Sequence, residues 1–61
     1  MELSTMQENV YLEISSFGWE FDYNTDDGDV VMVRREYIGD SLYKKYKVKI
    51  DKAGNRVDLD T

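Results

Sequence analysis

The stretch TMQENVYLEISSFGWEFDY, residues 5–23, decides the fold, because the spacing of its apolar residues changes at Gly18. Before Gly18 the apolar residues recur at steps of three or four, as on one face of a helix. They are Leu3, Met6, Val10, Ile14 and Phe17. After Gly18 the spacing is two, as in a half-buried strand, with Trp19, Phe21 and Tyr23 on one side. The stretch therefore predicts a helix over residues 5–16 followed by a strand.

Two overlapping capping boxes can begin this helix, Ser4-x-x-Gln7 and Thr5-x-x-Glu8. Gly18 stands where a helix is commonly ended by a residue of positive φ. A strand stays open as the alternative for the same segment, since its β-branched residues are mediocre helix formers and Val10, Leu12 and Ile14 also alternate. In that case the whole chain would be an all-β small barrel.

The rest of the chain contains two or three further strands. Asp27-Gly28 predicts a hairpin turn before a strand that begins at Val30, and Gly39-Asp40-Ser41 marks the next turn. The strand over residues 42–50 alternates, so Tyr46, Val48 and Ile50 are expected to face the core and Lys45, Lys47 and Lys49 to face solvent or a partner. A short strand over residues 56–59 can follow a tight turn. The prediction is one α+β domain, residues 1–61, in which an N-terminal helix packs on an antiparallel three- to four-stranded meander.

The second strand carries the apolar run Val30–Val33, which is typical of a middle strand with two apolar faces. We expect Val31 and Val33 to pack under the helix, so that Val30 and Met32 lie on the opposite face with Tyr43. One helix cannot cover both faces, and an uncovered apolar strip is a site of interaction with a second copy or a target. The polar residues expected at its rim are Lys45, Lys47, Glu20 and Asp22.

Charge is divided unevenly along the chain, whose net charge is −5. Residues 1–29 hold eight acids and no Lys or Arg, whereas the remainder holds five acids and all eight basic residues. The interpretation with most support is intramolecular pairing of the acidic and basic strands. The alternative is an acidic surface that imitates nucleic-acid phosphates, with Glu8, Glu13, Asp26, Asp27 and Asp29 as its candidates. The acids around Gly28 do not fit a calcium loop, since Arg34 stands where the bidentate glutamate belongs.

Composition bears on function mainly by exclusion. The chain has no Cys and no His, which removes disulfides, common zinc sites, thiol nucleophiles and the usual general base. We therefore expect no enzyme activity, no metal and no cofactor. The N-terminus lacks the basic start and apolar stretch of a signal peptide, and no apolar run reaches membrane-spanning length, so a cytoplasmic location without membrane contact is expected.

The expected function is that of a small acidic protein-binding module. An inhibitor or adaptor of the kind that phages and mobile elements encode would suit this size and charge, acting on an unidentified protein target. Small size without cross-links also favours a homodimer. The alternatives are a nucleic-acid-binding domain that uses the Lys, Arg and Tyr side chains of the later strands, which the net negative charge disfavours, and a purely structural subunit of a homo-oligomer.

Overall fold

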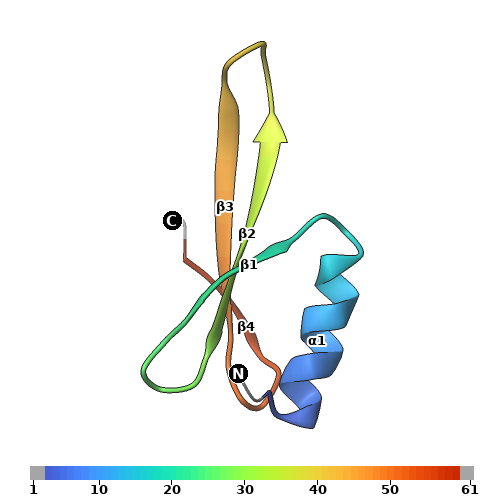
Figure 1. The fold of residues 1–61 in the computed structure, drawn as a ribbon, viewed down its shortest axis with the longest axis vertical. Helices are drawn as coiled ribbons and strands as arrows, with labels where there is room; N and C mark the ends of the chain where they lie inside the picture. The colour runs from blue at the N-terminus through green and yellow to red at the C-terminus, as the bar shows by residue number, and fades with distance from the viewer. Residues whose placement is uncertain (1–2, 60–61) are drawn as a thin grey trace.

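The helix and the sheet follow one another in the order that the sequence predicts (Figure 1). The computed structural model describes residues 3–59. Their elements are α1 (Thr5–Ser15), β1 (Glu20–Asn24), β2 (Val30–Tyr37), β3 (Tyr43–Ile50) and β4 (Arg56–Asp58). The strands form an open antiparallel sheet in the order β1-β2-β3-β4. The α+β meander is thus confirmed, and the all-β barrel is wrong.

Both ends of α1 have the predicted signals. The Ser4 hydroxyl accepts a hydrogen bond from the Gln7 backbone N–H at 3.1 Å, and the Gln7 side-chain oxygen accepts one from the Ser4 N–H at 3.2 Å. Of the two possible capping boxes, the first is therefore the one formed. At the other end Gly18 has a φ of +94°, and the Trp19 N–H donates to the Ile14 carbonyl at 3.3 Å. The positive φ turns the chain out of the helix and into β1.

The buried face of α1 contains a polar residue that the apolar pattern does not identify. Gln7 is 1% exposed. Its side-chain Nε2 donates to the carbonyls of Gly28 at 2.9 Å and Ile50 at 3.1 Å, which ties the first turn of the helix to the turn between β1 and β2 and to the end of β3. With Leu3, Val10 and Ile14, Gln7 completes a stripe at steps of four, three and four.

Two residues of the predicted helical stripe do not belong to it. Met6 and Phe17 are 61% and 73% exposed, so their predicted packing on the sheet is wrong. The reason is that the apolar series selected Met6 as the position one turn after Leu3, whereas the helix uses the neighbouring Gln7 there.

The assignment of β2 residues to the two faces of the sheet is opposite to the prediction. Val30 pairs with Ile50 and Met32 with Val48, and these four residues form the core cluster with Ile14 beneath the helix. Val31 and Val33 therefore lie on the far face. Of the core positions predicted on β3, Val48 and Ile50 are buried, whereas Tyr46 is half-buried and lies outside the core cluster. Partners on neighbouring strands share a face, which places Val30 and Met32 in the core.

Within residues 3–59 no second layer packs on the far face of the sheet, yet Val31 and Val33 are only 0% and 5% exposed. One ion pair passes over β2, from Lys47 of β3 to Asp22 of β1 at 3.5 Å, and a second joins Lys49 to Asp29, in the turn before β2, at 3.8 Å. Lys47 pairs with Val33 and Lys49 with Val31, so the apolar stems of the lysines are expected beside the valines, and the lysine side chains are 36% and 35% exposed. The predicted pairing of acidic and basic strands is present, and the predicted apolar strip is not.

A bulge in β1 alters the alternation of that strand. Phe21 pairs with Met32 but Tyr23 pairs with Val31, so Asp22 is the additional residue. Tyr23 consequently lies on the far face, where its ring is 5.8 Å from the Lys47 amine, and its predicted place under the helix is wrong.

Candidate functional site

The hairpin formed by β2 and β3 extends well beyond the rest of the molecule. β1 pairs with β2 only as far as Val33, and β4 pairs with β3 only at residues 48–50, with one further hydrogen bond from Leu59 to Lys47. Residues 34–46, which we call the arm, therefore form a two-stranded ribbon, and within residues 3–59 no strand pairs with either of its edges. Figure 1 shows the arm standing above the helix and β1, and it gives the molecule a longest dimension of 38 Å against 22 and 18 Å.

The end of the arm is apolar and exposed. The exposed fractions are 72% for Tyr37, 58% for Ile38, 66% for Leu42 and 47% for Tyr43. We call these four residues the arm tip. A hydrogen bond from the Ile38 N–H to the Leu42 carbonyl, at 3.0 Å, closes the loop, and the two tyrosine rings pack at a centroid distance of 5.5 Å. None of the four contributes to the buried core, so the arm tip is an exposed apolar surface.

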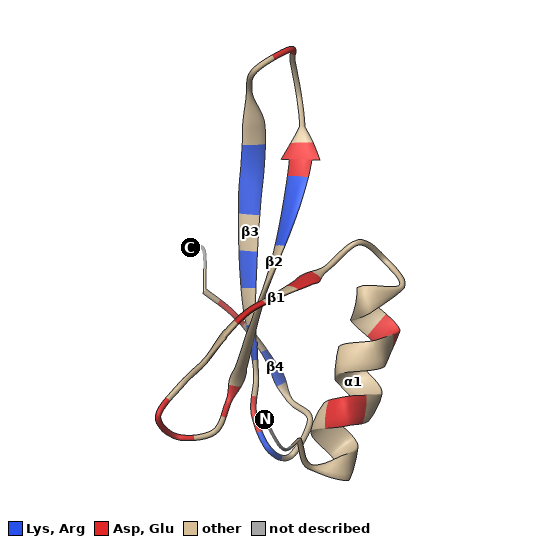
Figure 2. Cartoon of the chain, viewed as in Figure 1, with Lys and Arg blue, Asp and Glu red and all other residues tan. Residues whose placement is uncertain are grey.

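The base of the arm is held by its arginines. The Arg34 guanidinium lies 4.8 Å from the Tyr46 ring and 5.8 Å from the Trp19 ring. The Arg35 guanidinium lies 5.9 Å from the Tyr43 ring and forms an ion pair with Glu20. These contacts fix the direction in which the arm leaves the sheet. Figure 2 shows the arm's basic residues as bands of blue along β2 and β3.

The predicted interaction site is divided between the two faces of the sheet. Val30 and Met32 are 0% exposed beneath the helix, so their predicted place at an interface is wrong. Tyr43 belongs to the arm tip. The four rim residues lie on the far face, where Glu20, Asp22 and Lys47 form ion pairs and Lys45 is exposed at the level of Arg35. They have no apolar centre to surround, because the valines between them are covered.

Sequence reasoning missed Ile38 and Leu42 as site residues. Two signals could have found them. Both are large apolar residues that flank the turn Gly39-Asp40-Ser41, where polar residues are usual. The strands on either side of this turn are also the longest in the chain, and a long hairpin beside short outer strands must project from the sheet.

The five candidate acidic residues do not gather on one surface. Glu8 and Glu13 are exposed on α1, and Asp26 and Asp27 are exposed in the turn between β1 and β2. Figure 2 shows this turn and the helix on opposite sides of the body. Asp29 is engaged by Lys49, and its side chain is 13% exposed. The arrangement gives no support to imitation of a phosphate backbone.

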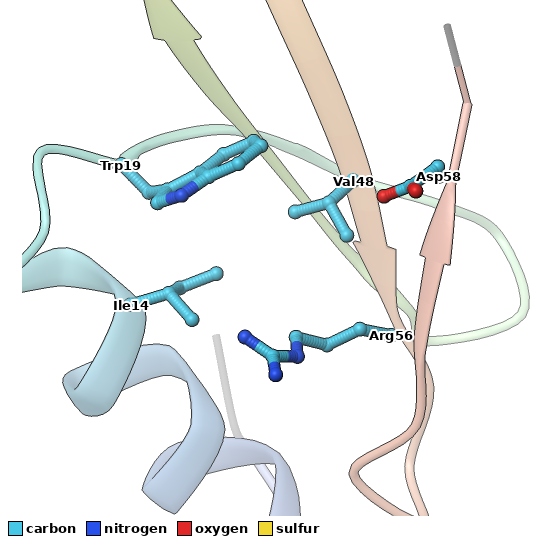
Figure 3. Close-up of a pocket in the computed structure, with 5 residues that line it drawn as sticks. All are labelled: Ile14, Trp19, Val48, Arg56 and Asp58. Carbon is cyan, nitrogen blue, oxygen red and sulfur yellow. The ribbon is translucent and has the colours of Figure 1, made fainter. Parts of the chain in front are cut away.

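A pocket of about 290 Å³ lies in the corner between the C-terminal half of α1 and the sheet, and we call it the corner pocket. Ile14, Trp19 and Val48 supply its apolar walls, and Arg56 and Asp58 of β4 supply its polar side (Figure 3). Figure 3 shows the Arg56 side chain extending from β4 toward Ile14. Within residues 3–59, neither Arg56 nor Asp58 forms a salt bridge.

One carboxylate has a perturbed pKa, and the cause is local. The backbone N–H of Asn55 donates to Asp51 at 2.8 Å, and with the Asn55 side chain and the Ala53 N–H it lowers the pKa of Asp51. These bonds shape the turn between β3 and β4 and indicate no catalytic role. Among the residues that the structure describes, no cluster of three metal-ligating side chains occurs and no helix has the length and apolar character to cross a membrane.

Comparison with known proteins gives no relative. No protein-family model, curated protein or solved structure matches the chain. The arm tip and the corner pocket are therefore the features on which an argument about function depends.

Proposed function

We propose that the chain is a protein-binding module, an inhibitor or adaptor, that contacts its partner through the arm tip. The observation that carries the proposal is the exposure of four large side chains at the end of an ordered ribbon. A two-stranded ribbon without a packed face is marginally stable in water. An arm of this length therefore lacks the buried apolar surface that would stabilise it in the isolated chain. A partner that covers the arm tip buries that apolar surface and so stabilises the arm.

Action by contact fits the chemistry of the chain. A chain without His or Cys lacks the usual general base and thiol nucleophile. The arm tip instead has the composition of an interface centre, with two tyrosines and two aliphatic residues, while Asp40 stands in the loop and the other charged residues of the arm lie on the strands below. Such a projection can enter a groove of another protein and block or bridge it.

A substitution that places charge in the arm tip tests the proposal. The double variant Ile38→Asp, Leu42→Asp should keep the circular dichroism spectrum and melting temperature of the wild type, because neither side chain belongs to the core. Immobilised wild type and variant are then incubated with lysate of the native host, and bound proteins are quantified by mass spectrometry. A partner that binds by the arm tip should be lost from the variant by at least tenfold, since two buried apolar anchors are removed.

The matched control places the same charge on another exposed apolar residue. Leu12 is 59% exposed on α1, and Leu12→Asp should retain every partner that the wild type retains. Equal capture by wild type and by the arm-tip variant would show that the arm tip is not the binding element.

A second candidate function has one observation in its favour. The arm carries Arg34, Arg35, Lys44 and Lys45 against Glu36 and Asp40, a charge of +2, whereas the other residues sum to −7. A two-stranded ribbon can enter the major groove of DNA. Both arginines are already engaged with aromatic rings and carboxylates of the chain, so two lysines remain for phosphates. For this reason protein binding is the better-supported function.

Fluorescence anisotropy with a labelled DNA duplex separates the two functions. If the arm binds nucleic acid, the affinity should fall steeply as the salt concentration rises. The double variant Lys44→Gln, Lys45→Gln should then reduce the slope of log affinity against log salt by the equivalent of about two phosphate contacts. Absence of binding at low salt removes this candidate and leaves the protein-binding proposal unchanged.

A further inference from the structure

We propose that the partner of the arm tip is a second copy of this chain, with the tip of each copy seated in the corner pocket of the other. This inference rests on the proposed function, since it takes the arm tip as the binding element and names what it binds. The result is a dimer with a two-fold axis, in which both copies use the same two surfaces.

The two surfaces are chemically complementary. The corner pocket has three apolar walls, and the Arg56 guanidinium and the Asp58 carboxylate lie on its polar side. The arm end offers Ile38 and Leu42 and, at the apex of the loop between them, the carboxylate of Asp40. Within residues 3–59, Asp40 forms no salt bridge, and neither does Arg56. Docking would bury the aliphatic side chains against Ile14 and pair the two charges.

The pocket of the same chain is out of reach of the arm tip. Met32 pairs with Val48 at the pocket, and Ile38 is six residues further along the chain, directly after β2. At about 3.3 Å per residue this separation is roughly 20 Å of straight ribbon. In a second copy related by two-fold symmetry, the pocket and the arm tip are the same distance apart but in the opposite direction. An axis halfway along the arm, at the level of the Arg35 and Lys45 pair, therefore brings both tips to both pockets at once.

The arms themselves match along this arrangement. On its helix-side face the arm carries one row of Arg34 and Tyr46 and a second row of Glu36 and Lys44, and α1 does not extend over either row (Figure 1). The two-fold axis lies between the two rows, so the row of Arg34 and Tyr46 in one copy faces the row of Glu36 and Lys44 in the other copy. Arg34 then faces a carboxylate and Lys44 faces a tyrosine ring, both favourable pairs.

The layer beside α1 is where the second arm would lie. Packed sheets are about 10 Å apart, which is also the usual distance of a helix from the partner it packs on. An arm lying face to face on the other arm thus meets the C-terminal end of α1. Phe17, at 73% exposed, lies at that end and would be covered by the incoming tip.

Molar mass decides the matter. Size-exclusion chromatography with light scattering, at concentrations well above micromolar, should give twice the chain mass of 7.2 kDa for the wild type. Asp40→Arg should give a single-chain mass, and so should Arg56→Asp, because each places like charges in both contacts. An equimolar mixture of the two variants should return to the two-chain mass, since every contact in the mixed pair then joins opposite charges.

The controls carry the same charge changes at exposed residues outside the contact. Asp26→Arg and Lys52→Asp should leave the wild-type mass unchanged. A wild type of single-chain mass, single variants that stay paired, or a mixture that stays unpaired would each overturn the inference. If the wild type has a single-chain mass but the arm-tip variant still loses captured proteins from the lysate, the dimer alone is refuted. If the wild type and the arm-tip variant capture the same proteins equally, the proposed function is refuted as well.

Discussion

Replacement of Gln7 by methionine is the perturbation that tests most directly how this small domain is held together. Methionine keeps the length and unbranched shape of the side chain but cannot form the three hydrogen bonds of the Gln7 amide. Two of these bonds go to the carbonyls of Gly28 and Ile50, and the third comes from the Ser4 N–H. The substitution therefore removes the bonds that join the helix cap, the turn between β1 and β2 and the end of β3, without creating a cavity.

The expected loss of stability is large for a chain of this length. A buried polar group that loses its partner costs about 1–3 kcal/mol, and only the bond to Ile50 is fully buried, so water can compensate part of the other two. We expect a total of about 2–4 kcal/mol. At about 0.05–0.15 kcal/mol per residue, the whole domain has roughly 3–9 kcal/mol. At the centre of both ranges, about 3 of roughly 6 kcal/mol, the substitution removes about half of the free energy of unfolding.

Urea denaturation followed by the fluorescence of Trp19 measures this loss. With a slope near 1–2 kcal/mol per molar urea, the midpoint should fall by about 2 M. Asn9→Met, on the exposed side of the same helix, is the matched control and should shift the midpoint little. A Gln7→Met protein within about 0.5 kcal/mol of the wild type would refute the reasoning, because it would mean that the three hydrogen bonds contribute no net stability.

Three further predictions concern the turns and the core. Gly54→Ala should lower the melting temperature by the equivalent of at least about 1 kcal/mol, because φ is +86° and the new Cβ would lie 3.2 Å from the Met6 carbonyl oxygen. Hydrogen bonds from Asn55 lower the pKa of Asp51, so the Asp51 carboxylate stabilises the fold above its ordinary pKa of 3.8, and this stabilisation is lost as the pH falls below that value. When the free energy of unfolding is measured against pH, the Asp51→Ala variant should therefore lose less stability in this acid range than the wild type. Trp19→Ala should destabilise by about 2–4 kcal/mol in urea denaturation, somewhat less than for a fully buried tryptophan, since Trp19 packs on the core but is half-buried.

The elements were predictable because each has a local cause. A capping box and a glycine of positive φ bound the helix, and the change of apolar spacing between them is visible in the sequence. The alternation of β3 correctly placed Val48 and Ile50 in the core. Such signals depend on a few neighbouring residues and on backbone geometry alone.

The faces of β2 were also predictable, although the apolar run itself does not decide them. Val30–Val33 has no alternation, so its register with β3 must assign the faces. A three-residue turn at residues 39–41 makes Ile38 and Leu42 partners, and counting back from them makes Met32 the partner of Val48. The alternation of β3 then assigns Met32 to the core. The predicted faces of β2 are wrong because the position of the turn at residues 39–41 was not combined with the alternation of β3.

Other features depend on contacts that no local pattern contains. Nothing in the sequence around Asp22 marks it as the additional residue of a bulge, and the bulge is what moves Tyr23 to the far face. The burial of Gln7 likewise depends on two carbonyls that lie 21 and 43 residues away. A polar residue in a buried stripe is identified only when its hydrogen-bond partners are known.

The uneven charge of the chain has a structural explanation that also bears on binding. The acidic first half supplies β1 and the turn after it, the basic second half supplies β3, and β2 lies between them, so Lys47 reaches Asp22 across the middle strand while Lys49 reaches Asp29 in that turn. Lys47 and Lys49 are the partners of Val33 and Val31, and these two valines are almost fully buried although α1 packs on the other face of the sheet. Charge that is used to cover the sheet is largely neutralised within the chain and is a weak attraction for a charged partner. The most exposed apolar side chains of the sheet are Tyr37, Ile38 and Leu42 of the arm tip, at 72%, 58% and 66%, whereas Phe21, Tyr23, Val57 and Leu59 are 42–47% exposed. For that reason the arm tip is the surface on which recognition is expected.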